Sequence, residues 1–174
     1  MTQLTSRDYA LIAAAAADSK KGTDILIQDV SDLLDVTDYF VIVSAKNDRQ
    51  VEAISDEVEE KLREKAGLKP YGREGLENCK WVLLDFGEMV VHIFQEETRD
   101  YYRLETIWND APLVDVSEAG IEAPEYSERI SKLIDAVLRN ESGEGDSAEE
   151  YQPEEADEGA AGNASAADAP ASAE

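Results

Sequence analysis

A tight turn between two apolar runs constrains the fold of this chain more than any other feature of its sequence. Residues Trp81–Phe86 and Met89–Phe94 are rich in β-branched and aromatic side chains, and only Gly87 and Glu88 separate them. A two-residue loop that contains glycine can adopt the positive φ angle of a hairpin turn, so this stretch predicts two antiparallel strands. Both runs are almost continuously apolar, which is typical of strands that are covered for most of their length inside a sheet.

The chain after this hairpin turns polar and is predicted to form one helix that runs through Trp108. Glu96 and Glu97 fall in its first turn, where negative charge suits the helix dipole. At helical spacing, the face expected to pack on the sheet carries Tyr101, Leu104 and Trp108. The opposite side carries Arg99, Tyr102 and Arg103.

The same kinds of pattern predict the other helices and strands. A first helix, capped by Thr5 or Ser6, ends before Gly22, and another runs from Asn47 to Gly67. Strands are predicted at residues 25–28 and 39–45, a loop at 70–75, and a last amphipathic helix at 126–137. This order predicts an α/β fold with a mixed sheet of four to five strands and packing helices.

Negative charge is strong throughout the chain and densest near its end. The 174 residues include 40 acids and 16 lysines and arginines, for a net charge of −24. Residues 141–174 hold 11 of the acids and none of the bases, which leaves 29 acids, 16 bases and a net charge of −13 for residues 1–140. An acidic surface repels phosphate backbones and attracts basic proteins, so a basic protein is the expected partner.

Composition divides the chain into three parts. Residues 1–120 are predicted to form the folded domain, residues 121–140 an additional amphipathic helix, and residues 141–174 a disordered acidic tail that has almost no large apolar side chain. Cys79 is the only cysteine, so no intrachain disulfide can form, which suits a cytoplasmic protein. No stretch reaches the apolar length of a membrane span, and we expect no membrane partner.

Few residues have the chemical context of a catalytic or cofactor-binding group. His92, the only histidine, lies inside an apolar run, where a core histidine with a hydrogen-bonded ring is expected. Cys79 has no evident basic surroundings and is expected to be a packing residue. Residues 71–75 lack both the glycine spacing of a dinucleotide loop and the lysine of a phosphate-binding loop. We therefore predict no catalytic residue, no metal and no cofactor.

Metal-dependent nucleotidyl transfer is the strongest enzyme alternative. It needs two carboxylates, two residues apart, on one face of a strand, and no predicted strand carries them. Glu57 and Glu59 have that spacing but fall in a helix, where they point about 200° apart. Asp85 and Glu88 flank the hairpin turn and could meet a cation, although acids are ordinary turn residues. A nucleotidyltransferase-like, nucleotide-binding enzyme is thus the alternative function.

Short motifs spread over residues 5–112 resemble, in order and spacing, the ribosomal silencing factor family, also called the Iojap-like proteins. The motifs are Thr37–Ile42, Arg49–Val51, Glu74–Gly75, Trp81–Gly87, Val90–Phe94, Arg99, Tyr101–Tyr102, Leu104–Glu105 and Trp108–Ala111. Glu88 departs from the pattern, since the family usually has Asp there. The helix from Tyr126 and the acidic tail lie outside the resemblance.

The resemblance implies a non-enzymatic factor with a nucleotidyltransferase-like fold that lacks the catalytic acids. Such a factor would bind the large ribosomal subunit through the basic ribosomal protein fourteen, at the face where the small subunit joins. Occupying that face would block subunit joining by sterics and repress translation when nutrients are short. The acidic body implies little direct contact with rRNA. A homodimer of the free protein is also allowed.

Five residues are predicted to contact the ribosomal protein: Trp81, Asp85, Glu88, Tyr102 and Glu105. Side chains alternate along a strand, so Trp81 and Asp85 point away from the apolar set Val82, Leu84 and Phe86, which belongs inside. A large aromatic beside a carboxylate suits an interface anchor, although a second layer of helices would instead cover Trp81. The other three residues are predicted rim positions, chosen from the family motifs and from charge.

Overall fold

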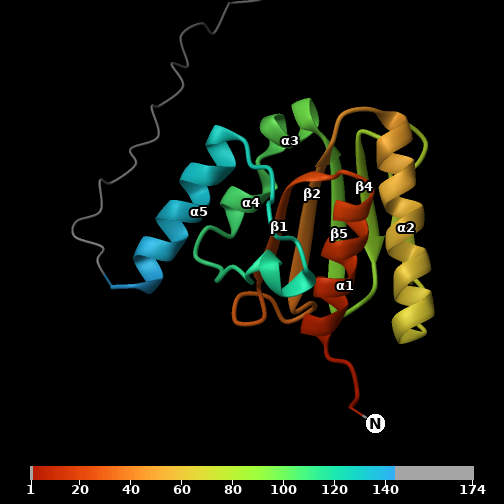
Figure 1. Cartoon of the computed structure of the whole chain (residues 1–174), viewed down its shortest axis with the longest axis horizontal. Helices are drawn as coiled ribbons and strands as arrows, with labels where there is room; N and C mark the ends of the chain where they lie inside the picture. Colours follow the sequence, from red (N-terminus) through yellow and green to blue (C-terminus); the bar gives the residue numbers. More distant parts are fainter. Residues whose placement is uncertain (1, 144–174) are drawn as a thin grey trace, which may run out of the picture.

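Five strands form one mixed sheet at the centre of the computed structural model, which describes residues 2–143. The strands are β1 (Thr23–Asp29), β2 (Tyr39–Ala45), β3 (Gly72–Glu74), β4 (Trp81–Asp85) and β5 (Met89–Gln95). Their order is β1-β2-β5-β4-β3, with β2 and β5 parallel and the other pairs antiparallel (Figure 1). The predicted α/β class and the mixed sheet of four to five strands are confirmed.

The predicted hairpin is β4 and β5, and it lies inside the sheet. Gly87 has a φ angle of 82°, and the amide of Phe86 donates to the carbonyl oxygen of Met89 at 2.9 Å, which closes the two-residue loop. A positive φ at the first loop position is characteristic of a type II′ turn. β5 pairs with β2 on one side and β4 on the other, so it is the central strand of the sheet.

The segment predicted as the loop 70–75 contains the edge strand β3, so that prediction is wrong in part. Gly72 pairs with Asp85, and Glu74 pairs with Leu83. A three-residue strand with no apolar run has no periodic signal, and only its pairing with β4 defines it. Gly75 follows with a φ angle of 86°, and a Cβ atom there would lie 1.9 Å from the carbonyl oxygen of Trp81.

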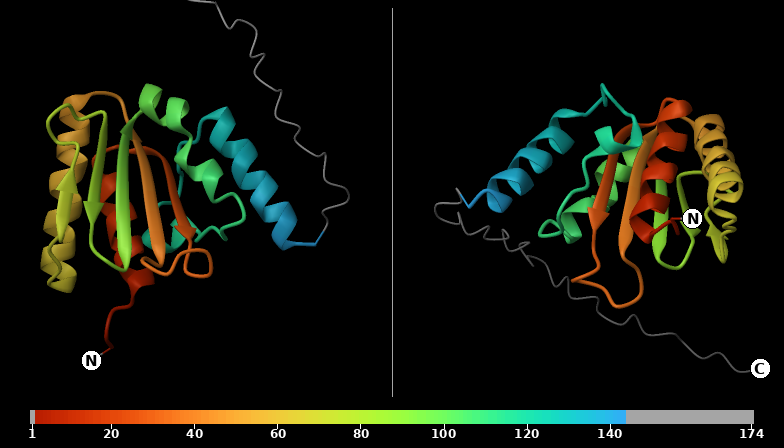
Figure 2. Two further views of the ribbon diagram at one scale, coloured as in Figure 1. Left: turned by 180° about the vertical axis from the view of Figure 1, so that it is seen from behind. Right: turned by 60° about the horizontal axis from the view of Figure 1, so that its bottom comes forward.

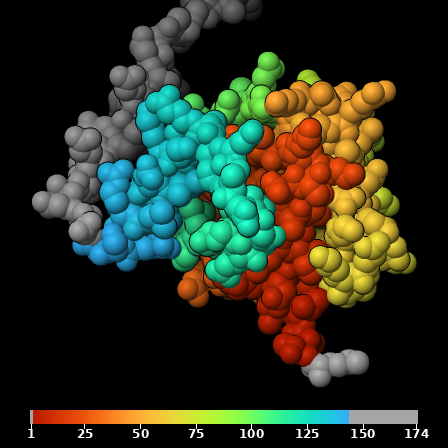
Figure 3. Space-filling view, in the orientation of Figure 1, coloured from red at the N-terminus to blue at the C-terminus, as the bar shows by residue number. Residues whose placement is uncertain are grey.

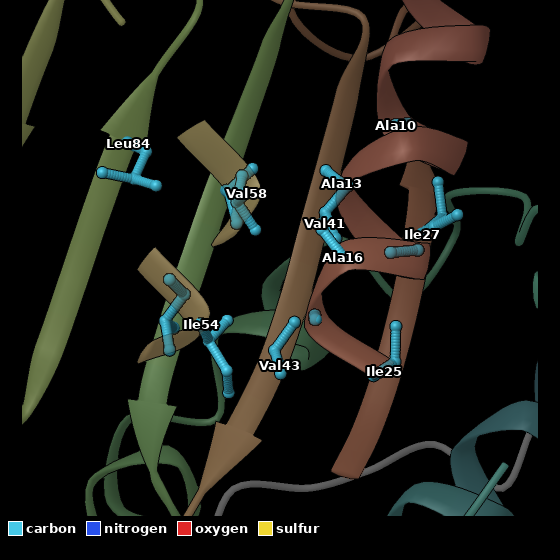
Figure 4. Close-up of a cluster of buried hydrophobic side chains, with 14 of the residues drawn as sticks. Ala10, Ala13, Ala16, Ile25, Ile27, Val41, Val43, Ile54, Val58 and Leu84 are labelled. Carbon is cyan, nitrogen blue, oxygen red and sulfur yellow. The ribbon is translucent and has the colours of Figure 1, made fainter. Parts of the chain in front are cut away.

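Two helices cover one face of the sheet: α1 (Ser6–Ser19) and α2 (Asp48–Ala66). Thr5 caps α1, Asn47 caps α2, and Gly67 ends α2 in the left-handed conformation, as the sequence predicts. The small alanine side chains of α1 pack against aliphatic residues of β1 and β2, including Ile27 (Figure 4). This layer holds the larger of two clusters of buried apolar residues.

The opposite face of the sheet is only partly covered. A smaller apolar cluster there consists of Val30, Phe40, Ile42, Phe94 and Ala111. Viewed from this side, β4 and β5 have no helix across most of their length, while the short helices lie to one side (left panel of Figure 2). This open face is where a partner can reach the sheet.

The single helix predicted after β5 is wrong, because the chain forms two helices. α3 (Glu96–Tyr102) ends where Arg103 adopts a φ angle of 48°, and α4 (Leu104–Ile107) starts in a new direction. As a result the predicted faces do not hold: Tyr101 is 82% exposed, while Arg99 is 1% exposed. Leu104 and Trp108 do pack against the smaller cluster, as predicted.

The remaining described residues lead to the helix α5 (Glu128–Glu141), by way of a 3-10 turn, η1 (Val116–Ala119). α5 lies along one flank of the molecule (Figures 1 and 3). It starts two residues later than the predicted helix: Ser127 is its cap, and Tyr126 instead donates its hydroxyl hydrogen to the carbonyl oxygen of Ile25 at 3.0 Å. Apart from its first three residues, the predicted tail lies outside the described residues. Within residues 2–143, no helix is long and apolar enough to cross a membrane.

Candidate functional site

Strand alternation on β4 sorts its side chains between the two faces as predicted. Val82 and Leu84 are fully buried under the helices, and Phe86 is 4% exposed. Trp81 and Asp85 are half-buried on the open face. The structure places both side chains on the open face, and their role in binding stays a prediction.

Trp81 is held in place by aromatic neighbours but keeps part of its surface open. Its ring stacks on Phe94 with the centroids 4.7 Å apart, and the ring of Tyr102 lies 5.1 Å away. Its indole N–H donates to Nδ1 of His92 at 3.1 Å. The neighbour from α3 is a single tyrosine ring, and Trp81 remains partly exposed. An aromatic side chain that is fixed before binding loses little conformational entropy on binding.

His92 has the core position and the hydrogen-bonded ring that the sequence predicts. It is 4% exposed, and burial lowers its pKa to about 4, so the ring is neutral near pH 7. Because Nδ1 accepts a hydrogen bond from Trp81, the ring proton is on Nε2. Nε2 is buried and has no hydrogen-bond partner among the described residues. The histidine therefore orients Trp81 through Nδ1.

Two predicted acids lie at the turn end of the open face. Asp85 accepts a hydrogen bond from the amide of Gly87 at 2.8 Å, so one carboxylate oxygen shapes the turn. Glu88 is exposed, and its carbonyl oxygen accepts from the amide of Asp38 at 2.9 Å. Tyr71, which the sequence analysis missed, is exposed beside them: a Cβ atom on Gly87 would lie 3.0 Å from its ring.

Tyr102 and its neighbour Tyr101 form the other end of the open face. Tyr102 is 53% exposed, and the two tyrosine rings meet edge to face with centroids 5.0 Å apart. Tyr101 was predicted to pack on the sheet, so its exposure is a correction. The left-handed residue Arg103, which ends α3 at this point, leaves both rings at the surface.

Glu105 was predicted at the rim of the interface, and the structure contradicts this. Its side chain is 0% exposed, with carboxylate oxygens 3.6 Å from Nε of Arg99 and 2.5 Å from Nη1 of Arg129. The reason is the turn at Arg103, which directs Glu105 inward, toward two arginines that offset the cost of burying its charge. Arg129 lies 24 residues further along the chain, so local sequence gives no sign of this pairing.

A groove of about 480 Å³ crosses the tyrosine end of the open face. It is lined by Gly75, Asn78, Lys80, Trp81, Glu97, Thr98, Tyr101 and Tyr102. Aromatic faces with a carboxylate beside them can receive a cationic side chain, by cation–π attraction and by charge. Burial raises the pKa of the Cys79 thiol, which favours its protonated form. Among residues 2–143, no three His, Cys, Asp or Glu side chains are placed to share a metal ion.

The comparison with protein families covers most of the described chain. A family model described as "Ribosomal silencing factor during starvation" matches residues 3–141. The chain belongs to this family. The matched residues include α5, which the motifs at 5–112 had left outside the resemblance. The division of the chain at residue 120 stays a prediction.

Relatives and solved structures agree with this membership. The ribosomal silencing factor of Bacillus subtilis is 44% identical over 105 residues, 60% of this chain and 88% of that protein. A more distant relative, the mouse mitochondrial assembly of ribosomal large subunit protein 1, is 36% identical over 87 residues, 49% of this chain and 38% of that protein. A crystal structure from Chromobacterium violaceum is 35% identical, has a TM-score of 0.58, and aligns with 60% of this chain and 87% of its own.

Proposed function

We propose that this member of the ribosomal silencing factor family binds the large ribosomal subunit and blocks joining of the small subunit, which represses translation. Its direct partner would be the basic ribosomal protein fourteen. The family description refers to silencing during starvation, and the name of the mouse relative refers to the large subunit. Both support a ribosomal target and a regulatory role, and we place this activity in the cytoplasm.

The observation that carries the proposal is the open face of the sheet. Trp81 and Tyr102 lie against each other at one end of it, with their rings tilted by 48°. Asp85 and Glu88 lie at the other end, so a large aromatic anchor is bordered by negative charge. Interface anchors of this kind are usually aromatic, and acidic surroundings select a basic protein. An acidic body repels rRNA, which favours docking through a protein over docking through phosphates.

Steric blocking requires no chemistry, and we propose that the protein is not an enzyme. The nucleotidyltransferase-like alternative predicts a different behaviour: magnesium-dependent turnover of a nucleotide. The two functions can be separated in one set of assays, because subunit blocking is stoichiometric and needs no nucleotide.

The test is co-sedimentation with purified large subunits, followed by a reassociation assay with small subunits. We expect the protein to move with the large subunits and to lower the yield of joined ribosomes without added nucleotide. A variant of the proposed binding surface should change an exposed residue. Glu88→Lys meets this condition because Glu88 is exposed, and Glu105→Gln does not because Glu105 is buried. If the wild-type protein does not sediment with large subunits, the proposed function is wrong.

A further inference from the structure

Four charged side chains from α3, α4 and α5 meet behind the tyrosine end of the open face. Glu105 is paired with Arg99 and with Arg129, and Arg129 also bonds Oδ1 of Asp100 through Nε at 3.0 Å. Arg99 and Glu105 are almost fully buried, and Arg129 is largely covered. Asp100 is 67% exposed, so the buried negative charge is that of Glu105, and it is tolerated because two arginines pair with it. Figure 2 shows α5 beside α4 at this place.

The positions of the two acids along the chain give this cluster a role beyond packing. Asp100 directly precedes the tyrosine pair, Tyr101 and Tyr102, and Glu105 follows it by three residues. Arg129 therefore holds the tyrosine segment at both of its ends, from a different helix. Between them, the ring of Tyr102 lies 5.1 Å from that of Trp81.

The tyrosine segment needs external support. α3 has seven residues and α4 has four, and helices this short are not stable by themselves in water. The junction at Arg103 has a φ angle of 48°, a conformation that a residue with a side chain adopts only when its surroundings enforce it. Tyr101 and Tyr102 are exposed and contribute little burial to hold the segment.

We propose that Arg129 is a positioning residue for docking on the ribosome: α5 braces the tyrosine end of the docking surface from behind. This inference rests on the proposed function, because the surface that it stabilises is the one proposed to bind the large subunit. Arg129 itself makes no contact with the partner. It acts by fixing Tyr102 against Trp81 before the partner arrives, which reduces the ordering cost of binding.

The binding test uses Arg129→Met, which keeps the alkyl packing of the side chain and removes both ion pairs. Lys132→Met is the matched control, since Lys132 is on the same helix and its ion pair with Glu128 is exposed. We expect Arg129→Met to weaken large-subunit binding about tenfold and Lys132→Met to leave it within about twofold.

A double-mutant cycle separates positioning from a general structural role. In a Tyr102→Ala background the Tyr102 ring is absent and cannot be positioned. There, Arg129→Met should weaken large-subunit binding by no more than about twofold. An equal loss in both backgrounds, or no loss in either, would overturn the proposal. Should Arg129→Met melt too low to assay, Asp100→Asn removes the pair at the exposed end alone and should weaken binding in the same way, by a smaller factor.

A second readout does not depend on the ribosome. The indole N–H of Trp81 gives one of two tryptophan side-chain signals in a proton–nitrogen correlation spectrum, assigned with Trp108→Phe. Arg129→Met should shift and broaden the Trp81 signal, and Lys132→Met should not. An unmoved signal overturns the brace regardless of binding. If Arg129→Met shifts the Trp81 signal but the wild-type protein does not bind large subunits, the spectrum supports the brace. The failure to bind then refutes the proposed function.

Discussion

The two faces of the sheet are made by alternate residues of the same strands, but their contents differ. Under α1 and α2, Val82 and Leu84 are fully buried among aliphatic side chains. On the opposite face, Trp81 and Asp85 from the same strand stay half-exposed. A step of one residue therefore separates positions that stabilise the fold from positions that a partner can reach. Neighbours on β4 can serve as controls for each other.

The largest expected effect lies on the covered face. Leu84→Ala leaves a cavity in a close-packed layer, so it should lower the free energy of unfolding by roughly 2–5 kcal/mol. Denaturant unfolding measures this loss. The molecules that remain folded should bind large subunits as tightly as the wild type does. If binding falls further than the folded fraction explains, the division between the two faces is wrong.

A pH effect is expected from the histidine below the open face. The pKa of His92 is about 4 in the folded protein, compared with 6.5 in an unfolded chain, so the unfolded state takes up the proton first as the pH falls. The stability that comes from keeping His92 neutral in the folded state is fully present above pH 6.5. As the pH falls to 4, the free energy of unfolding decreases by about 3 kcal/mol from this cause. The His92→Gln variant should lack this decline.

Unfolding free energies of the two proteins, measured at several pH values, test the histidine prediction. Other acids titrate in both proteins, so the difference between them isolates His92. If the free energy of unfolding depends on pH equally in both proteins, water reaches the His92 ring in solution. The open face would then be looser than the structure indicates.

Replacing the aromatic anchor should separate binding from stability. Trp81→Ala is expected to weaken large-subunit binding by about 2 kcal/mol, roughly thirtyfold, while the melting temperature falls less than for Leu84→Ala. Trp81→Phe keeps a ring on Phe94 and should recover part of the affinity. Binding and melting curves of the three variants form the experiment. A binding loss that only follows unfolding would mean that Trp81 is a core residue.

The smallest effect concerns the acidic residues beyond α5. Deleting residues 144–174 should change binding by less than about tenfold, or 1.4 kcal/mol, because their sequence offers almost no large apolar anchor. Sedimentation of the truncated and full chains with large subunits measures the difference. A larger loss would mean that the open face is not the whole docking surface.

Local patterns were sufficient for the parts of the fold that rest on periodic burial. The hairpin at Gly87, the caps at Thr5 and Asn47, and the stop at Gly67 all follow from short-range rules. The same alternation placed Trp81 and Asp85 on the open face. For these residues the deciding interactions lie within a few positions along the chain.

Prediction failed where a distant partner decides the conformation. Helical spacing placed Tyr101 inside and Arg99 outside, but the helix ends at Arg103, and Arg99 is buried beside Glu105, which also pairs with Arg129. No local pattern in the sequence of α5 indicates that Arg129 pairs with Glu105 of α4. The edge strand β3 was missed for a similar reason, since pairing with β4 alone makes it a strand.

The parallel pairing of β2 with β5 has a consequence for how the chain folds as it is synthesised. Tyr39 pairs with Met89, so the central contact of the sheet joins residues fifty positions apart. Non-local contacts of this kind slow folding, because closing the long intervening loop costs entropy before the contact contributes any stability. β2 stays without its central neighbour until residues 89–95 have left the ribosome, and until then its hydrogen-bonding edge is open to other chains.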